Sequence, residues 1–301
     1  MSDTAASLRS KIASAGELES VVRTMKAMAA SSIGQYEKSV RALSDYSRTV
    51  ELGLCACFRN SGPATSFAER KRHTMAGPIG AVVFGSDQGL VGQFNDVVVD
   101  FAVKTLAALP GTHRVWAVGE RVQGRLSDAR LSLAGVFAVP NSVKAITPLV
   151  GEILVESETH HSQGELAELY LFHNRSTSGA VYEPVRQRLL PLDETWRRQL
   201  AALPWPTENL PEVVGLGTET LRAIIREYLF VSLFRACAES LASENASRLA
   251  AMQRADKNIA ELLEHLNGTF HRLRQGGIDE ELFDVVSGFE ALSYERRRSS
   301  A

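Results

Sequence analysis

Proline is confined to the middle of this chain. All ten prolines lie between residues 63 and 211, so residues 1–62 and 212–301 contain none. An interior proline removes a backbone hydrogen bond and costs a helix about 3 kcal/mol, so long helices exclude it. The distribution predicts one long helix at each end, of about 50 and 75 residues, or about 75 and 110 Å at 1.5 Å per residue.

Apolar residues in both end segments recur at steps of three and four. The series covers residues 8–54 and again 241–273, with a period of about 3.5 residues, as in a left-handed coiled coil. We therefore predict an antiparallel coiled-coil shaft of residues 1–60 and 212–301. The seam residues on which this prediction depends most are Leu18, Met25, Ala29, Leu249, Met252 and Ile259.

Residues 76–205 have a different pattern. Three short runs favour strands: 80–84, 114–118 and 166–172. An amphipathic helical pattern at 96–109 follows the first of these runs. Strands that alternate with helices predict a small α/β domain with a mostly parallel sheet. The expected fold class is thus α/β, with a central domain between the two helices of a long coiled coil.

Charge and composition exclude several classes of protein. There are 33 Lys and Arg against 35 Asp and Glu, a net charge of −2, and no long basic stretch, so a nucleic-acid partner is not expected. Three irregularly spaced cysteines are too few for a disulfide framework and fit a reducing compartment. The most apolar window, 221–241, carries five charged residues, and the first residues lack the apolar core of a signal peptide. We expect no membrane span.

The segment Gly85–Gly92 is the feature most like an enzyme's. It follows a predicted strand and precedes a predicted helix, so its backbone N–H groups could hold a phosphate. Its glycine spacing fits neither the dinucleotide fingerprint nor the P-loop. A tight strand-to-helix turn, in which glycine supplies left-handed backbone angles, is the preferred interpretation.

Other candidate chemistry is weaker. His160 and His161 lie among acidic residues, but adjacent ligands diverge, so a solvated loop is expected there rather than a metal site. Cys55 and Cys57 are too close for a redox pair and are interpreted as packing residues. We therefore predict no catalytic residue, no cofactor and no metal.

The C-terminal segment contains an interruption of the apolar seam. Arg274–Gln275–Gly276–Gly277 breaks the seam, and an acidic stretch followed by an apolar tail, residues 282–289, comes after it. A frayed and capped helix end is one interpretation. The alternative is that this stretch leaves its coiled-coil partner and enters another protein, which would bury the tail.

Several motifs resemble the γ subunit of F-type ATP synthases. In the end helices these are residues 8–14, 25–31, 241–252 and 274–288, and in the middle they are 86–95 and 171–175. The resemblance runs from about residue 8 to 292. The sequence departs from the family at Ser32, Gly34 and Gln35, where many members carry basic residues, and at Asp279, where a hydroxyl residue is common.

This resemblance implies a central rotor shaft that couples ion flow to ATP synthesis or hydrolysis. The implied partners are the ATP synthase α and β subunits, the ε subunit and the c-ring, at the cytoplasmic face of the cell membrane. The residues it places against partners are Arg274, Gln275, Met25, Lys26, Arg23 and Glu281. Two alternatives stay open from the residues alone: a non-rotary coiled-coil adaptor and, less favoured, a phosphate-ligand-binding α/β enzyme.

Overall fold

The computed structural model describes residues 4–298 apart from 61–76, 178–180, 210 and 214–216, and from residue 289 on it describes the backbone alone. Contacts divide the chain into two units. We call the described residues up to Ala27 and from Met252 onward the helical unit, and residues 28–251 the sheet unit.

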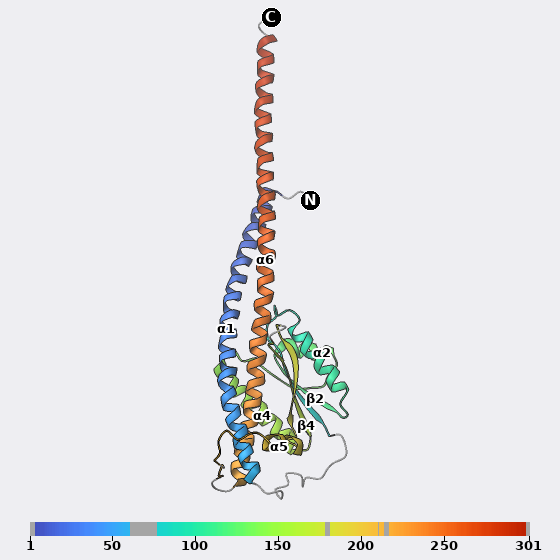
Figure 1. The fold of residues 1–301 in the computed structure, drawn as a ribbon. Helices are drawn as coiled ribbons and strands as arrows, with labels where there is room; N and C mark the ends of the chain where they lie inside the picture. Colours follow the sequence, from blue (N-terminus) through green and yellow to red (C-terminus); the bar gives the residue numbers. More distant parts are fainter. Residues whose placement is uncertain (1–3, 61–76, 178–180, 210, 214–216, 299–301) are drawn as a thin grey trace. The chain divides into compact units, whose positions relative to one another are not determined.

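Both predicted end helices are present (Figure 1). Helix α1 comprises Ala5–Asn60 and helix α6 comprises Gly217–Arg298, or 56 and 82 residues. In the helical unit, Lys26 pairs with Asp256, and the Arg9 guanidinium lies 5.2 Å from the centre of the Phe270 ring. The earlier residue of α1, Arg9, contacts the later residue of α6, Phe270, so the two helices are antiparallel, as predicted.

From Leu8 to Val50, the buried residues of α1 follow a seven-residue repeat. They are Leu8, Ala15, Val22, Ala29, Tyr36 and Val50. The prediction that Leu18 belongs to this seam is wrong, because its side chain is 58% exposed. The second seam position of each heptad lies four residues after the first, which places Glu19, half-buried, where Leu18 was expected.

The sheet unit contains a five-stranded sheet in the order β3-β2-β1-β4-β5. The strands are β1 (Ile79–Phe84), β2 (His113–Val118), β3 (Leu133–Phe137), β4 (Glu168–Arg175) and β5 (Glu183–Leu190). The first four strands are parallel, and β5 is antiparallel to β4. The mostly parallel sheet is confirmed, and β3 and β5 are strands that the sequence pattern did not indicate.

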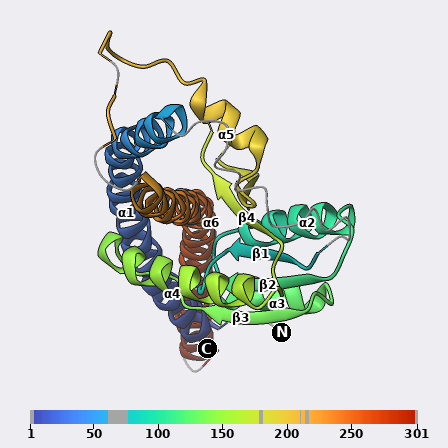
Figure 2. The ribbon, with the colours of Figure 1, turned by 90° about the horizontal axis from the view of Figure 1, so that it is seen from below.

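Helices cover both faces of this sheet (Figure 2). Helices α2 (Phe94–Ala107) and α3 (Glu120–Asp128) bury alternate residues of β1 and β2 on one face. On the other face, α4 (Val143–Ser162) packs with α6, and Tyr36 of α1 joins the same core. A third cluster joins the end of α1 to α5 (Glu194–Ala201) and to the first turns of α6.

Two further expectations can be compared with the fold. His160 and His161 lie in the last turn of α4 and not in a loop, because the helix continues through this polar stretch. Cys55 and Cys57 are buried, free thiols that pack in the core, as interpreted from the sequence. The contacts group the chain differently from the predicted division into 1–60 with 212–301 and 76–205, since parts of both long helices pack on the sheet.

Candidate functional site

The crevice at the carboxyl ends of β1 and β4 is where a fold of this kind would hold a ligand. Strand β1 pairs with β2 on one side and with β4 on the other. The chain leaves β1 through α2 on one face of the sheet and enters β4 through α4 on the other face. Open α/β sheets bind ligands at such a topological switch point. The residues of this crevice therefore decide between the interpretations of the Gly85–Gly92 segment.

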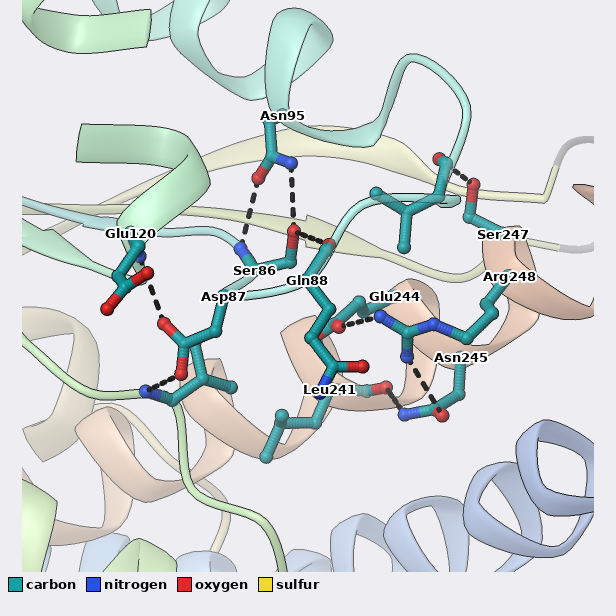
Figure 3. Close-up of polar contacts among 12 residues, drawn as sticks. Ser86, Asp87, Gln88, Asn95, Glu120, Leu241, Glu244, Asn245, Ser247 and Arg248 are labelled. Atoms are coloured by element: carbon teal, nitrogen blue, oxygen red, sulfur yellow. Dashed lines mark hydrogen bonds and ion pairs between the residues drawn. The ribbon is translucent and has the colours of Figure 1, made fainter. Parts of the chain in front are cut away.

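The segment after β1 is held by a closed polar network (Figure 3). The backbone N–H of Ser86 donates to Asn95 Oδ1 at 3.0 Å, and Asn95 Nδ2 donates to Ser86 Oγ at 2.8 Å. Gly85 has no room for a side chain, since a Cβ would lie 2.3 Å from Val122 Cβ. Leu90 and Gly92 have positive φ values of 63° and 58°. The segment is thus a tight turn packed against α2 and α3.

Asp87 binds the N-terminus of α3, the helix that follows β2. Its Oδ1 accepts from the backbone N–H of Glu120 at 2.9 Å, at the start of α3, and its Oδ2 accepts from that of Val139 at 3.0 Å. The Ser86 carbonyl accepts from the backbone N–H of Arg121 at 2.9 Å. The first N–H groups of α3 are satisfied by this segment, so an external anion would have to displace a bound carboxylate.

Helix α6 fills the rest of the crevice with polar side chains. Ser247 Oγ donates to the Val91 carbonyl at 2.6 Å. Ser243 Oγ lies 3.3 Å from Ser176 Oγ, just beyond the end of β4. Because these hydroxyls are buried and bonded to the turn and to the strand end, α6 occupies the place that a ligand takes in related architectures.

Glu239 of α6 forms a second buried contact with the sheet. Its Oε2 lies 2.9 Å from His173 Nε2 of β4, and its Oε1 accepts from Arg235 Nε at 2.8 Å. Burial alone would raise the pKa of Glu239. The hydrogen bonds from His173 and Arg235 outweigh burial and lower the pKa below its usual value. The carboxylate is therefore held in its ionised form between two partners.

Glu244 has the opposite electrostatic environment. Burial raises the pKa of its carboxyl, and the Arg248 guanidinium, 2.6 Å away, opposes this only in part. The negative charge of Asp87 adds to the increase. Figure 3 shows the pair beside the turn, where Arg248 also donates to Asn245 at 3.4 Å. Two acidic groups from segments far apart in sequence thus lie close enough to repel each other.

The residues predicted to contact partners lie in the helical unit. Arg274, Gln275 and Glu281 are exposed on α6. Arg23 is exposed and pairs with Glu19 at 2.8 Å, while Lys26 is half-buried. The structure thus leaves most of these side chains accessible and does not gather them into one cluster.

The remaining residues of the predicted seam are all at least half-buried. Ala29 and Met252 are buried, and Met25, Leu249 and Ile259 are half-buried. The apolar tail at 282–286 is exposed, and Phe289 lies outside the described side chains.

Sequence reasoning identified the motifs 86–95 and 241–252 separately and missed that they meet. Ser247 and Val91 are 156 positions apart, and neither motif points to the other. The signal that was present is the recurrence of polar residues at a spacing of four, Glu239, Ser243 and Ser247, on one face of a helix. Polar residues on the buried side of a helix need partners, which could have directed attention to this face.

Comparison with known proteins shows the family to which the chain belongs. The family model described as ATP synthase matches residues 4–292. The ATP synthase gamma chain of Desulfitobacterium hafniense is 25% identical over 96% of this chain and 99% of its own length. That of Nitratidesulfovibrio vulgaris is 30% identical over 71% of this chain and 73% of its own length. The chain belongs to the ATP synthase gamma chain family.

Solved structures share the gamma chain fold. A chain of the Euglena gracilis mitochondrial ATP synthase, in a complex with OSCP, F1 and the c-ring, has a TM-score of 0.60 at 15% identity, covering 95% of this chain and 93% of that one. A chain of the Tetrahymena thermophila mitochondrial central stalk and c-ring has a TM-score of 0.54 at 20% identity, covering 78% and 99%. These likenesses establish the fold.

Membership of the gamma chain family confirms the predicted resemblance and supports the role of central shaft. The adaptor and the phosphate-ligand enzyme are not favoured. Among the described residues, no three His, Cys, Asp or Glu side chains are grouped as a metal site would require. Within the same residues, no helix combines the length and the apolar character needed to cross a bilayer.

Proposed function

We propose that this chain is the central rotor shaft of an F-type ATP synthase. It couples ion flow through a c-ring to ATP synthesis or hydrolysis in a hexamer of α and β subunits, and an ε subunit accompanies it. The chain itself carries out no ATP chemistry. It acts by its shape and by its contacts, at the cytoplasmic face of the cell membrane.

One observation carries this proposal: the chain matches the ATP synthase family over residues 4–292 and gamma chains over most of its length, and its helices of 56 and 82 residues run antiparallel. Helices of this length exceed what a five-stranded sheet needs for packing, since the mean helix of a globular protein has about 11 or 12 residues. Among the described residues, the helical unit is built from segments of these two helices. Such a pair is suited to contact other subunits.

The partner contacts follow from exposed charge on α6. Arg274 and Gln275 are exposed and carry up to seven N–H donors between them. A charge-assisted hydrogen bond to a carboxylate of a β subunit would contribute about 1.5–3 kcal/mol in whichever state makes it. Because only contacts that differ between states can shift an equilibrium, bonds of this kind let shaft angle bias the β subunits. Arg23, Met25, Lys26 and Glu281 are proposed to extend this contact surface.

The test is reconstitution with α and β subunits from the same organism. The chain should co-purify with them as one complex, and a probe fixed to the chain should rotate in steps when ATP is added. The isolated chain should show no ATP turnover. A variant that lacks residues 274–298 is compared with the natural chain in the same assays, because it loses the proposed partner contacts on α6 and retains the sheet unit.

The outcomes separate the alternatives. Rotation of the probe with the complex supports the shaft. ATP turnover by the isolated chain, free of other subunits, contradicts a non-catalytic shaft. A stable homodimer that ignores α and β subunits contradicts the shaft and supports the coiled-coil adaptor.

A further inference from the structure

Helix α6 presents a stripe of buried polar residues to the sheet. Glu239, Ser243 and Ser247 are spaced four residues apart, so they lie on one face of the helix, and they are 9%, 0% and 7% exposed. Each bonds to a different place at the carboxyl edge of the sheet: His173 in β4, Ser176 after β4, and the Val91 carbonyl after β1. The stripe therefore follows the switch-point crevice along its length.

Most of the remaining buried face of α6 in this unit is apolar. Leu233, Cys237 and Leu241 lie in the apolar core together with residues of α4 and the sheet. Apolar contact is non-directional, so a helix held by it alone can turn by small angles while most of the area stays buried. Hydrogen bonds require a defined distance and an angle above about 150°, so they weaken when the helix turns.

The ends of the stripe are the points best placed to resist such a turn. Glu239 and Ser247 are eight residues apart, or about 12 Å along the helix axis. At one end, Glu239 bonds to His173 of the sheet, and Arg235 of α6 itself orients the same carboxylate. At the other end, Ser247 donates a hydrogen bond of 2.6 Å to a backbone carbonyl in a turn that is itself fixed to α2. Two separated, directional anchors define one rotational setting of α6.

We propose that the switch-point crevice is a socket, in which the stripe of Glu239, Ser243 and Ser247 locks the rotational angle of α6 relative to the sheet. Torque then passes between the sheet and the shaft helix through these three contacts. This inference rests on the proposed function, because the interface between α6 and the sheet transmits torque only in a rotor. The crevice that holds a small ligand in other open α/β folds here holds part of the chain's own helix.

The experiment measures torsional stiffness in the assembled complex. The α and β hexamer is fixed to a surface, and a bead is attached through Asp100→Cys, an exposed position on α2; the three native cysteines are buried. The angular variance of the bead during pauses reports the stiffness between the sheet and the hexamer.

Three chains are compared with the natural one: Ser247→Ala, Glu239→Gln and their combination. Ser127→Ala, on the exposed side of α3, is the matched control.

We expect the angular variance to rise at least two-fold in the combined variant and less in each single variant, with the control unchanged. Ion pumping per ATP should fall in the same order, while ATP hydrolysis without a load stays within two-fold of the natural rate. Ser247→Thr retains the hydroxyl and should restore stiffness relative to Ser247→Ala. This rescue separates the hydrogen bond from a general loss of packing.

An unchanged variance in a folded, rotating complex with the combined variant overturns the socket and leaves the shaft proposal intact. If the combined variant does not fold, Ser247→Ala decides, because it removes one oxygen atom and no charge. Failure of the natural chain to assemble or rotate overturns the proposed function, and the socket with it. The two failures are thereby distinguished.

Discussion

Lys26 Nζ lies 2.6 Å from Asp256 Oδ2, an ion pair that joins α1 to α6 across 230 positions of sequence. The hydrogen bond from Lys26 is the main cause that lowers the pKa of Asp256, and the nearby Arg23 contributes to the same effect. Lys26 stands four residues after the buried Val22, on the second row of the seam. A charged pair thus takes a position that apolar residues usually fill, which sets the register of the two helices.

Removing this pair should weaken the helical unit in a pH-dependent way. A carboxyl with a lowered pKa contributes stability above its unfolded value of about 3.9, and this contribution is lost as pH falls through the folded pKa. We expect Lys26→Met and Asp256→Asn to be non-additive at pH 7 and less strongly coupled near pH 3. A double-mutant cycle on the thermal midpoint measures this. Equal coupling at both pH values would count against the ion pair.

Glu244 should show the opposite pH dependence. Its raised pKa means that the folded chain binds the proton more tightly than the unfolded chain. Stability therefore falls as pH rises from about 4.3 through the folded pKa. Glu244→Gln retains an acceptor for Arg248 and lacks this loss, so its stability relative to the natural chain should improve with rising pH. Urea unfolding at pH 4.5 and pH 8 tests the direction, and a difference that shrinks with rising pH contradicts it.

A charge at the buried seam should be poorly tolerated. Ala29 is 2% exposed, so Ala29→Glu places an unpaired carboxylate in the interface or forces the helix pair apart. We expect a loss of more than about 3 kcal/mol in the free energy of unfolding, together with impaired assembly. Ala30→Glu, one position away and exposed, is the matched control and should be nearly neutral. Similar unfolding curves for the two variants would mean that the seam does not include Ala29.

The strands that the sequence pattern indicated are the central ones. β1, β2 and β4 are buried on both faces, so they appear as continuous apolar runs. The two edge strands lack that signal: β3 alternates between half-buried and exposed residues, and β5 contains Pro184, Arg186 and Arg188. Edge strands tolerate proline and charge, which is why their composition resembles that of a loop.

The sequence pattern did not predict which residues form the seam, nor did it predict the polar contacts between α6 and the turn after β1. Stepping from one apolar residue to the next selected Leu18, although the seven-residue repeat from Leu8 passes through Ala15 and Val22 and leaves Leu18 exposed. The contact of Ser247 with Val91 depends on how the sheet and α6 pack, and no local pattern encodes it. The two long helices, by contrast, follow from proline exclusion and local periodicity alone.

Gly85 should not accept even a methyl group. A Cβ there would lie 2.3 Å from Val122 Cβ and 2.7 Å from Asn95 Oδ1, so α3 or the turn would have to move. We expect Gly85→Ala to lower the free energy of unfolding by about 1–3 kcal/mol. Gly151→Ala is the matched control, because nothing lies within 4 Å of its Cβ position in α4. Alanine there should raise helix stability by up to about 1 kcal/mol. Chemical denaturation of both variants measures the contrast, and a stabilised Gly85→Ala would contradict the close packing.

Arg274 and Gln275 should matter for the turnover of the complex and not for the folding of the chain. Both are exposed on α6 in the helical unit, so replacing them should leave the isolated chain folded. If they bond to a β subunit in one of its states only, Arg274→Ala with Gln275→Ala should permit assembly and slow ATP turnover of the complex. Loss of a single contact of about 1.5–3 kcal/mol corresponds to roughly 10- to 150-fold in the step that it biases. Arg272→Ala, also exposed, removes a guanidinium that bonds within its own helix and serves as the control. A double variant whose complex runs at the natural rate, with natural ion coupling, would show that torque passes to the β subunits through other residues.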